Sequence, residues 1–163
     1  MGVTGVSEAG SGWRGAVEVP PEVRDAVDGV PELDTLEPVL TLLTVDSEGR
    51  VDVCLLSRTE VEATQRSVRL VVAGRKARRN LRATGRATVV VVADDAAHYL
   101  ALRARRVIEE DDAMAAELEV ERYLRDGLDV ELHPMRFLVD GRLVVEERWD
   151  QTRRLLARLA IHE

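Results

Sequence analysis

The sequence predicts an α+β domain, a six-stranded antiparallel β-barrel with flanking helices, and three observations predict it. Short runs of β-favouring residues recur along the chain between turn residues. A few helical segments interrupt these runs. The 163 residues are 45% hydrophobic but only 3% aromatic, so one core of Val, Leu and Ala suits the chain. Closing the strands into a barrel hides edges that an open sheet exposes.

The chain begins with a segment rich in Gly, Ser and Val, and residues 1–19 are predicted to form a flexible arm that docks through Trp13. Residues 20–163 are predicted to form a single domain. Pro20-Pro21 introduces its first, short helix, which ends at Gly29. The arm is therefore expected to contribute little to the core.

The first two strands are predicted at residues 36–46 and 50–57. The turn Asp46-Ser47-Glu48-Gly49 joins them, and its Gly tolerates a positive φ, so they are expected to form an antiparallel hairpin. Cys54 lies inside the second strand and is interpreted as a small core residue rather than a nucleophile.

The middle of the chain predicts a strand at residues 67–73, a short helix at 75–82 and a strand at 86–92. The fifth strand, residues 99–108, alternates apolar residues with arginines, which gives it one dry face and one cationic face.

The last third predicts two helices and a hairpin. The acidic run at residues 109–112 is expected to open a helix that reaches Arg125. Asp140-Gly141 is expected to form the tight turn of a hairpin between residues 135–139 and 142–146. Asp150 is expected to cap a final helix whose apolar side packs on the body, with Trp149 as its anchor.

The charge of the chain is strongly local. Residues 66–106 contain eleven of the 23 basic residues and only two acids, Asp94 and Asp95, which gives +9 against −16 for the remainder and −7 in total. Within this stretch, Gly74-Arg75-Lys76 stands between a strand and a helix, where cationic side chains and free amides favour an anionic group. Gly74 lets the backbone come close to it. A solvated basic turn is the other interpretation of the same residues.

The order of elements over residues 36–148 resembles the split-barrel flavin-binding family typified by pyridoxamine 5′-phosphate oxidase. The resemblance implies a split barrel and a homodimer with flavin mononucleotide (FMN) at the subunit interface. It implies that Gly74, Arg75 and Lys76 contact the flavin phosphate, and that Leu55-Leu56-Ser57 lies along the cofactor. Ser57 and Arg58, just after the second strand, are further candidates for cofactor contact.

The function that the resemblance implies is a flavin-dependent oxidoreductase acting on a small molecule, in which the cofactor does the redox chemistry. Deazaflavin or haem is the alternative cofactor, since related split barrels use both. Gly74 stands where the family has a phosphate-binding Ser and aromatic rings are scarce, so a cofactor-free binding or regulatory module is the second hypothesis.

Other function classes are disfavoured. An acidic chain without aromatic residues among its arginines is a poor nucleic-acid binder. His98, His133 and His162 lack the spacing of metal ligands, so no metal site and no catalytic residue is predicted. The single cysteine excludes an intramolecular disulfide, and no secretory signal or membrane segment is recognised, so a cytoplasmic protein is expected.

Overall fold

The fold was analysed in a computed structural model, which describes residues 12, 14–15, 18–127 and 129–161. Trp13 lies outside the described residues. In chain order the elements are β1 (Arg14–Gly15), α1 (Pro21–Val27), β2 (Leu36–Pro38), β3 (Leu40–Val45), β4 (Val51–Leu56), the 3₁₀ turn η1 (Arg58–Glu60), β5 (Val61–Ala63), β6 (Ser67–Val72), α2 (Arg75–Thr84), β7 (Arg86–Ala93), β8 (Ala96–Glu110), β9 (Ala113–Gly127), β10 (Arg136–Leu138), α3 (Gly141–Glu146) and α4 (Trp149–Ala160).

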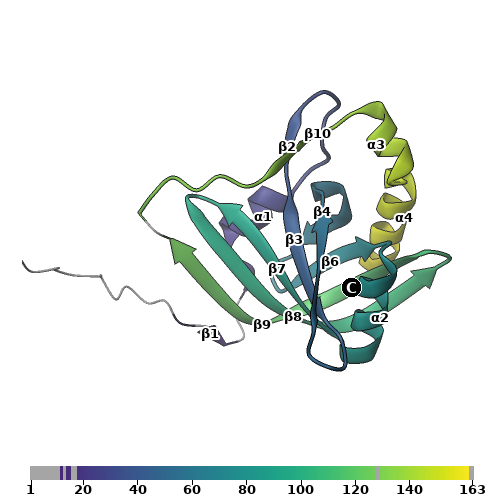
Figure 1. Ribbon diagram of the computed structural model, residues 1–163, viewed down its shortest axis with the longest axis horizontal. Helices are drawn as coiled ribbons and strands as arrows, with labels where there is room; N and C mark the ends of the chain where they lie inside the picture. Colours follow the sequence, from purple (N-terminus) through teal and green to yellow (C-terminus); the bar gives the residue numbers. More distant parts are fainter. Residues whose placement is uncertain (1–11, 13, 16–17, 128, 162–163) are drawn as a thin grey trace, which may run out of the picture.

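The architecture is α+β, with a curled antiparallel sheet in the order β4-β3-β7-β8-β9-β6-β5. β1 adds to β9 off this path, and β2 pairs with β10 in a separate two-stranded ladder. Figure 1 shows the long strands β8 and β9 crossing the molecule, α3 and α4 along one side, and α2 beside β3. The predicted α+β class with an antiparallel sheet is confirmed, but the strand count of six is too low.

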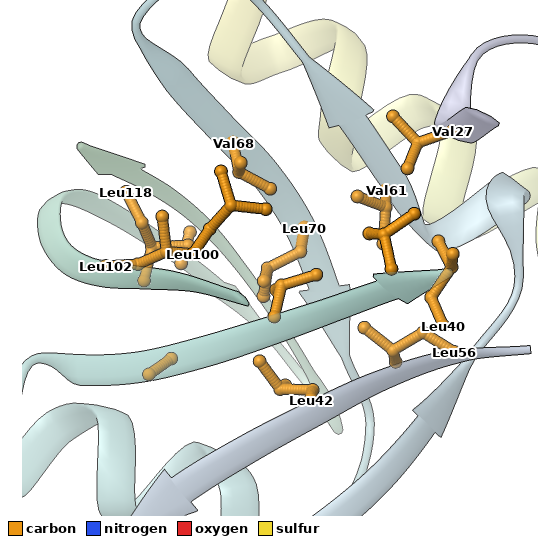
Figure 2. Packing of buried hydrophobic residues seen from close by; sticks show 14 of the residues in the cluster. Val27, Leu40, Leu42, Leu56, Val61, Val68, Leu70, Leu100, Leu102 and Leu118 are labelled. Atoms are coloured by element: carbon orange, nitrogen blue, oxygen red, sulfur yellow. The ribbon is translucent and has the colours of Figure 1, made fainter. Parts of the chain in front are cut away.

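The core fills the concave side of the curled sheet. Alternate residues of β3 and β8, such as Leu40, Leu42, Leu100 and Leu102, are almost fully buried. Figure 2 shows their side chains converging with those of β6 and β9, while Val27 of α1 closes one end. A second, smaller cluster places Leu155, Leu156 and Leu159 of α4 against β6 and β9, as the apolar side of the predicted final helix required.

The helix predicted from residue 109 to Arg125 is wrong, because this segment is the strand β9. Leu118 and Val120 alternate with glutamates, which is the period of a strand, and their side chains are buried. The outward glutamates pair with the cationic side of β8: the Arg103 Nε to Glu121 Oε1 distance is 2.5 Å, and Arg105 pairs with Glu119. Residues 109–112 therefore form a strand end and a turn, with Asp111 at a φ of 47°.

The hairpin predicted around Asp140-Gly141 is also wrong. The Asp140 carboxylate accepts a hydrogen bond from the Leu143 backbone N–H (2.8 Å), so it caps α3 instead of turning a hairpin. β10 pairs with β2, more than ninety positions earlier in the chain, through Phe137 and Glu37. Asp150 does not cap α4 either, since Arg148 holds the N-cap position and Asp150 lies in the first turn.

Candidate functional site

The N-terminus of α2 is an open, positively charged end of a helix. Gly74 is the N-cap and no side chain caps the helix, while the first turn carries Arg75 and Lys76 and no acid. A Cβ at Gly74 would meet nothing within 4 Å. The first amides of a helix have no partner inside the helix and lie at the positive end of its dipole. This end of α2 can therefore accept an anionic group.

The α2 helix is attached to the edge strand β4. Asn80 is buried and donates hydrogen bonds to Thr44 Oγ1 (3.1 Å) and Asp52 Oδ2 (2.9 Å). Asp52 also accepts from Lys76 Nζ at 3.3 Å, and these contacts lower the pKa of Asp52, first through Asn80 and then through Lys76. The Lys76 side chain remains 73% exposed. Asn80 thus fixes the helix, and Lys76 stays accessible to solvent.

The outer face of the sheet, on the side opposite α2, is largely apolar and partly exposed. On β4, Val51, Val53 and Leu55 are each about 60% exposed. Across the sheet, one row runs from Leu55 to Thr41, Val90 and Tyr99, and the next from Val53 to Leu43, Thr88 and Ala101. We call these two rows with Val45 and Val51 the outer face. β4 lies at the end of the sheet path, so the outer face reaches a sheet edge.

A cleft of about 210 Å³ opens at the C-terminal end of β4. Leu55, Leu56 and Ser57 line it together with Phe137 and Trp149. A second hollow shares Glu60 and Glu147 with this cleft and reaches Ala73, directly before Gly74. The two hollows therefore connect the end of β4 with the start of α2.

The predicted site residues are divided between these features. Gly74, Arg75 and Lys76 are exposed at the start of α2, and Leu55 is exposed on β4. Leu56 and Ser57 are buried. Arg58 donates to both Glu37 oxygens, from Nε at 2.7 Å and Nη2 at 2.9 Å, and to the Asp28 carbonyl at 2.7 Å. Cofactor contact by Arg58 stays a prediction, and it would require this pair to open.

Ser57 belongs to a capping box with Glu60, which sequence reasoning did not single out. The Glu60 Oε2 atom accepts from the Ser57 backbone N–H (2.6 Å) and from its hydroxyl (3.0 Å). Burial raises the pKa of Glu60 despite these bonds, and the negative charge of Glu147 adds to the rise. The pattern Ser-Arg-Thr-Glu was the available signal, since Ser followed by Glu three positions later is typical of a capping box.

The raised pKa of Glu60 predicts how stability depends on pH. The folded-state pKa lies above the unfolded one, so the contribution of Glu60 is fully present below the unfolded pKa and is lost as pH rises through the folded pKa. We therefore expect the difference in melting temperature, Glu60→Gln minus wild type, to become more positive as the pH is raised from about 4 to about 8. Circular dichroism melts measure it, with the exposed Glu32→Gln as control; a difference that falls with pH contradicts the assignment.

The remaining titratable candidates do not form a reactive group. His98 is buried, with Nδ1 2.8 Å from the Tyr123 hydroxyl and Nε2 3.1 Å from the Ala93 carbonyl, so both ring nitrogens are occupied. Burial, with smaller effects of Glu60 and Glu147, raises the pKa of Cys54, which disfavours the thiolate. Within the described residues, no three His, Cys, Asp or Glu side chains are grouped to hold a metal ion.

Comparison with known proteins identifies the fold. No family model matches the sequence, and no curated protein matches it. Among solved structures, an FMN-binding protein from Syntrophomonas wolfei is 15% identical, with a TM-score of 0.51 over 66% of this chain and 85% of that one. The HupZ protein of Group A Streptococcus is 12% identical, with a TM-score of 0.51 over 71% of this chain and 99% of that one. The chain shares the split-barrel fold with these proteins.

None of the helices in the described part of the chain is both long enough and apolar enough to cross a membrane.

Proposed function

We propose that this protein binds FMN in a cytoplasmic homodimer and acts as a flavin-dependent oxidoreductase on a small molecule. The observation that carries the proposal is the uncapped start of α2, where Gly74, Arg75 and Lys76 are exposed and Lys76 contacts Asp52 of the edge strand β4. The shared fold with an FMN-binding protein supports this choice of anion. When bound, FMN supplies the electron transfer, and the protein supplies binding and orientation.

The residues at the start of α2 fit a phosphate group. The guanidinium of Arg75 and the ammonium of Lys76 are donors for charge-assisted hydrogen bonds, and the open space above Gly74 lets an oxygen approach the helix amides. Lys76 contacts Asp52 at 3.3 Å, but an exposed pair contributes little and is easily exchanged for a phosphate. Leu55 offers an exposed apolar side chain for the ring system.

The homodimer is part of the proposal because the outer face requires a partner. Its two rows present mostly apolar side chains, interrupted by Thr41 and Thr88, and an exposed, largely apolar surface of this kind marks an interaction site. A second copy of the same face is self-complementary about a two-fold axis, as in most soluble homodimers. We propose that this face forms the subunit interface and that the cofactor lies beside this interface, at β4.

A titration of the purified protein with FMN tests the proposal. We expect quenching of flavin fluorescence and a calorimetric dissociation constant in the low micromolar range or below, at a stoichiometry of about one FMN per chain. A visible flavin spectrum in gently purified protein would agree with it. Saturation only in the millimolar range would contradict cofactor binding.

A cofactor-free binding module is the second candidate, and one observation favours it. Asp52 already supplies Lys76 with a counter-charge, so the start of α2 is not without a partner. In that case the dimer would form without FMN, and the titration would show no binding. Deazaflavin and haem are the other cofactors to test if FMN fails.

A further inference from the structure

The cleft at the end of β4 combines apolar walls with two carboxylates. Leu55, Leu143, Phe137 and Trp149 form much of its lining, and Glu60 and Glu147 are its charged residues. Phe137 and Glu60 are half-buried, Trp149 is buried, and Glu147 is exposed. The cleft is therefore largely apolar but carries two carboxylates, the half-buried one of Glu60 and the exposed one of Glu147 at its rim.

No basic side chain lines the cleft, and among the described residues neither carboxylate forms an ion pair. The arginines nearest in sequence are already used: Arg58 pairs with Glu37, and Arg148 Nη1 lies 2.7 Å from Asp112 Oδ2. Most outward carboxylates of the neighbouring β9 strand, by contrast, have an arginine partner. The cleft therefore keeps a negative charge that no basic residue of its own lining neutralises, although Ser57 donates two hydrogen bonds to Glu60 and Arg148 lines the adjoining hollow.

The chemistry of the lining selects among ligand classes. An anion would be repelled by both carboxylates, and a neutral apolar ligand would desolvate them without a counter-charge. A cation gains from both carboxylates, and the rings of Phe137 and Trp149 offer π faces that attract cations. An apolar group on the same ligand would fill the space along Leu55 and Leu143.

We infer that this cleft binds a small organic cation, an amine or quaternary ammonium compound with one apolar ring or chain. The cation lies between Glu60 and Glu147, and the apolar group packs on Trp149 and Phe137. This inference goes beyond the proposed function. The cleft shares Leu55 with the proposed flavin site, but its carboxylates and rings belong to one chain and need neither FMN nor a second subunit.

Calorimetry on flavin-free protein tests the inference with three probes that share a benzyl or phenyl group. We expect benzyltrimethylammonium to bind at least about tenfold more tightly than benzyl alcohol, and benzoate not to bind, because only the first probe carries a positive charge. Raising the salt concentration weakens the binding of the cation.

Substitutions locate the site. We expect Glu147→Gln to weaken binding of benzyltrimethylammonium about fivefold, and Glu60→Gln to weaken it at least as much. Glu147 accepts no hydrogen bond in the described structure, so its variant keeps the test valid if Glu60→Gln fails to fold. Glu32→Gln, which removes an exposed carboxylate from the loop before β2, leaves binding unchanged.

Equal affinity for benzyl alcohol and benzyltrimethylammonium would overturn the inference, as would no binding at millimolar concentration or the same loss with Glu32→Gln as with Glu147→Gln. Because the probes are used without flavin, a failed FMN titration leaves this result intact. A failed cation titration likewise leaves the FMN proposal standing.

Discussion

We expect the double variant Arg75→Ala, Lys76→Ala to bind FMN about a hundredfold more weakly than the wild type. Each charged hydrogen bond to a phosphate contributes about 1.5 kcal/mol, and 1.4 kcal/mol corresponds to a factor of ten. The variant is expected to fold, because Arg75 is exposed and the Lys76 pair with Asp52 is exposed on its lysine side. Calorimetric titration with FMN measures the loss.

The matched control removes two charges elsewhere. Arg79 lies one turn further along α2 and Arg154 on α4, and both are exposed. The double variant Arg79→Ala, Arg154→Ala has the same net charge as the first, so a long-range effect of charge would weaken both equally. We expect it to bind FMN within about twofold of the wild type. Equal loss in the two variants would mean that the start of α2 does not hold the phosphate.

The second large effect is expected at the outer face. Val53 is 63% exposed in the single chain and lies directly opposite Leu43 in the sheet. If this face forms the subunit interface, Val53→Asp buries an unpaired carboxylate there, which costs several kcal/mol. The dimer dissociation constant then rises roughly a thousandfold. Light scattering after gel filtration should then give the mass of one chain instead of two.

The control for the outer face is another exposed valine. Val130, 55% exposed in the segment after β9, can be replaced by Asp without placing a charge on the sheet. We expect Val130→Asp to remain dimeric. A wild-type protein that is monomeric at high micromolar concentration, or a Val53→Asp variant that stays dimeric, would contradict the assignment of this face.

The sequence predicted the elements whose signals are local. These are the hairpin of β3 and β4, the strand β6 and the helix α2, whose end the prediction placed at residue 82 without using the signal of Gly85. Gly85 adopts a φ of 61° and its N–H bonds to the Leu81 carbonyl at 2.9 Å, as a left-handed C-cap requires. Adjacent residues alone specify such features.

The two failures have different physical causes. The segment that became β9 contains good helix formers, and its strand form is stabilised by glutamates that meet the arginines of β8. β10 pairs with β2 from the other end of the chain. The alternation of Leu118 and Val120 with glutamates was a local signal of β9 that the helix prediction missed, since β8 and β9 are neighbours in the chain. The partners in β2 and β10 lie about a hundred positions apart, so local propensity does not reveal them.

The candidate site was predictable only in part for the same reason. Arg75 and Lys76 are neighbours in the chain, and their place at a helix start follows from local pattern. The cleft, by contrast, brings Glu60 together with Phe137 and Glu147, which lie more than seventy positions later in the chain. Only the folded structure shows that its two carboxylates face apolar walls.

The most direct test compares the affinities for FMN and riboflavin, which differ only in the phosphate. If the start of α2 holds that phosphate, the wild-type protein binds FMN about a hundredfold more tightly than riboflavin, and Arg75→Ala, Lys76→Ala binds both about equally. The same preference for FMN in both proteins, or no preference in the wild type, would contradict the account.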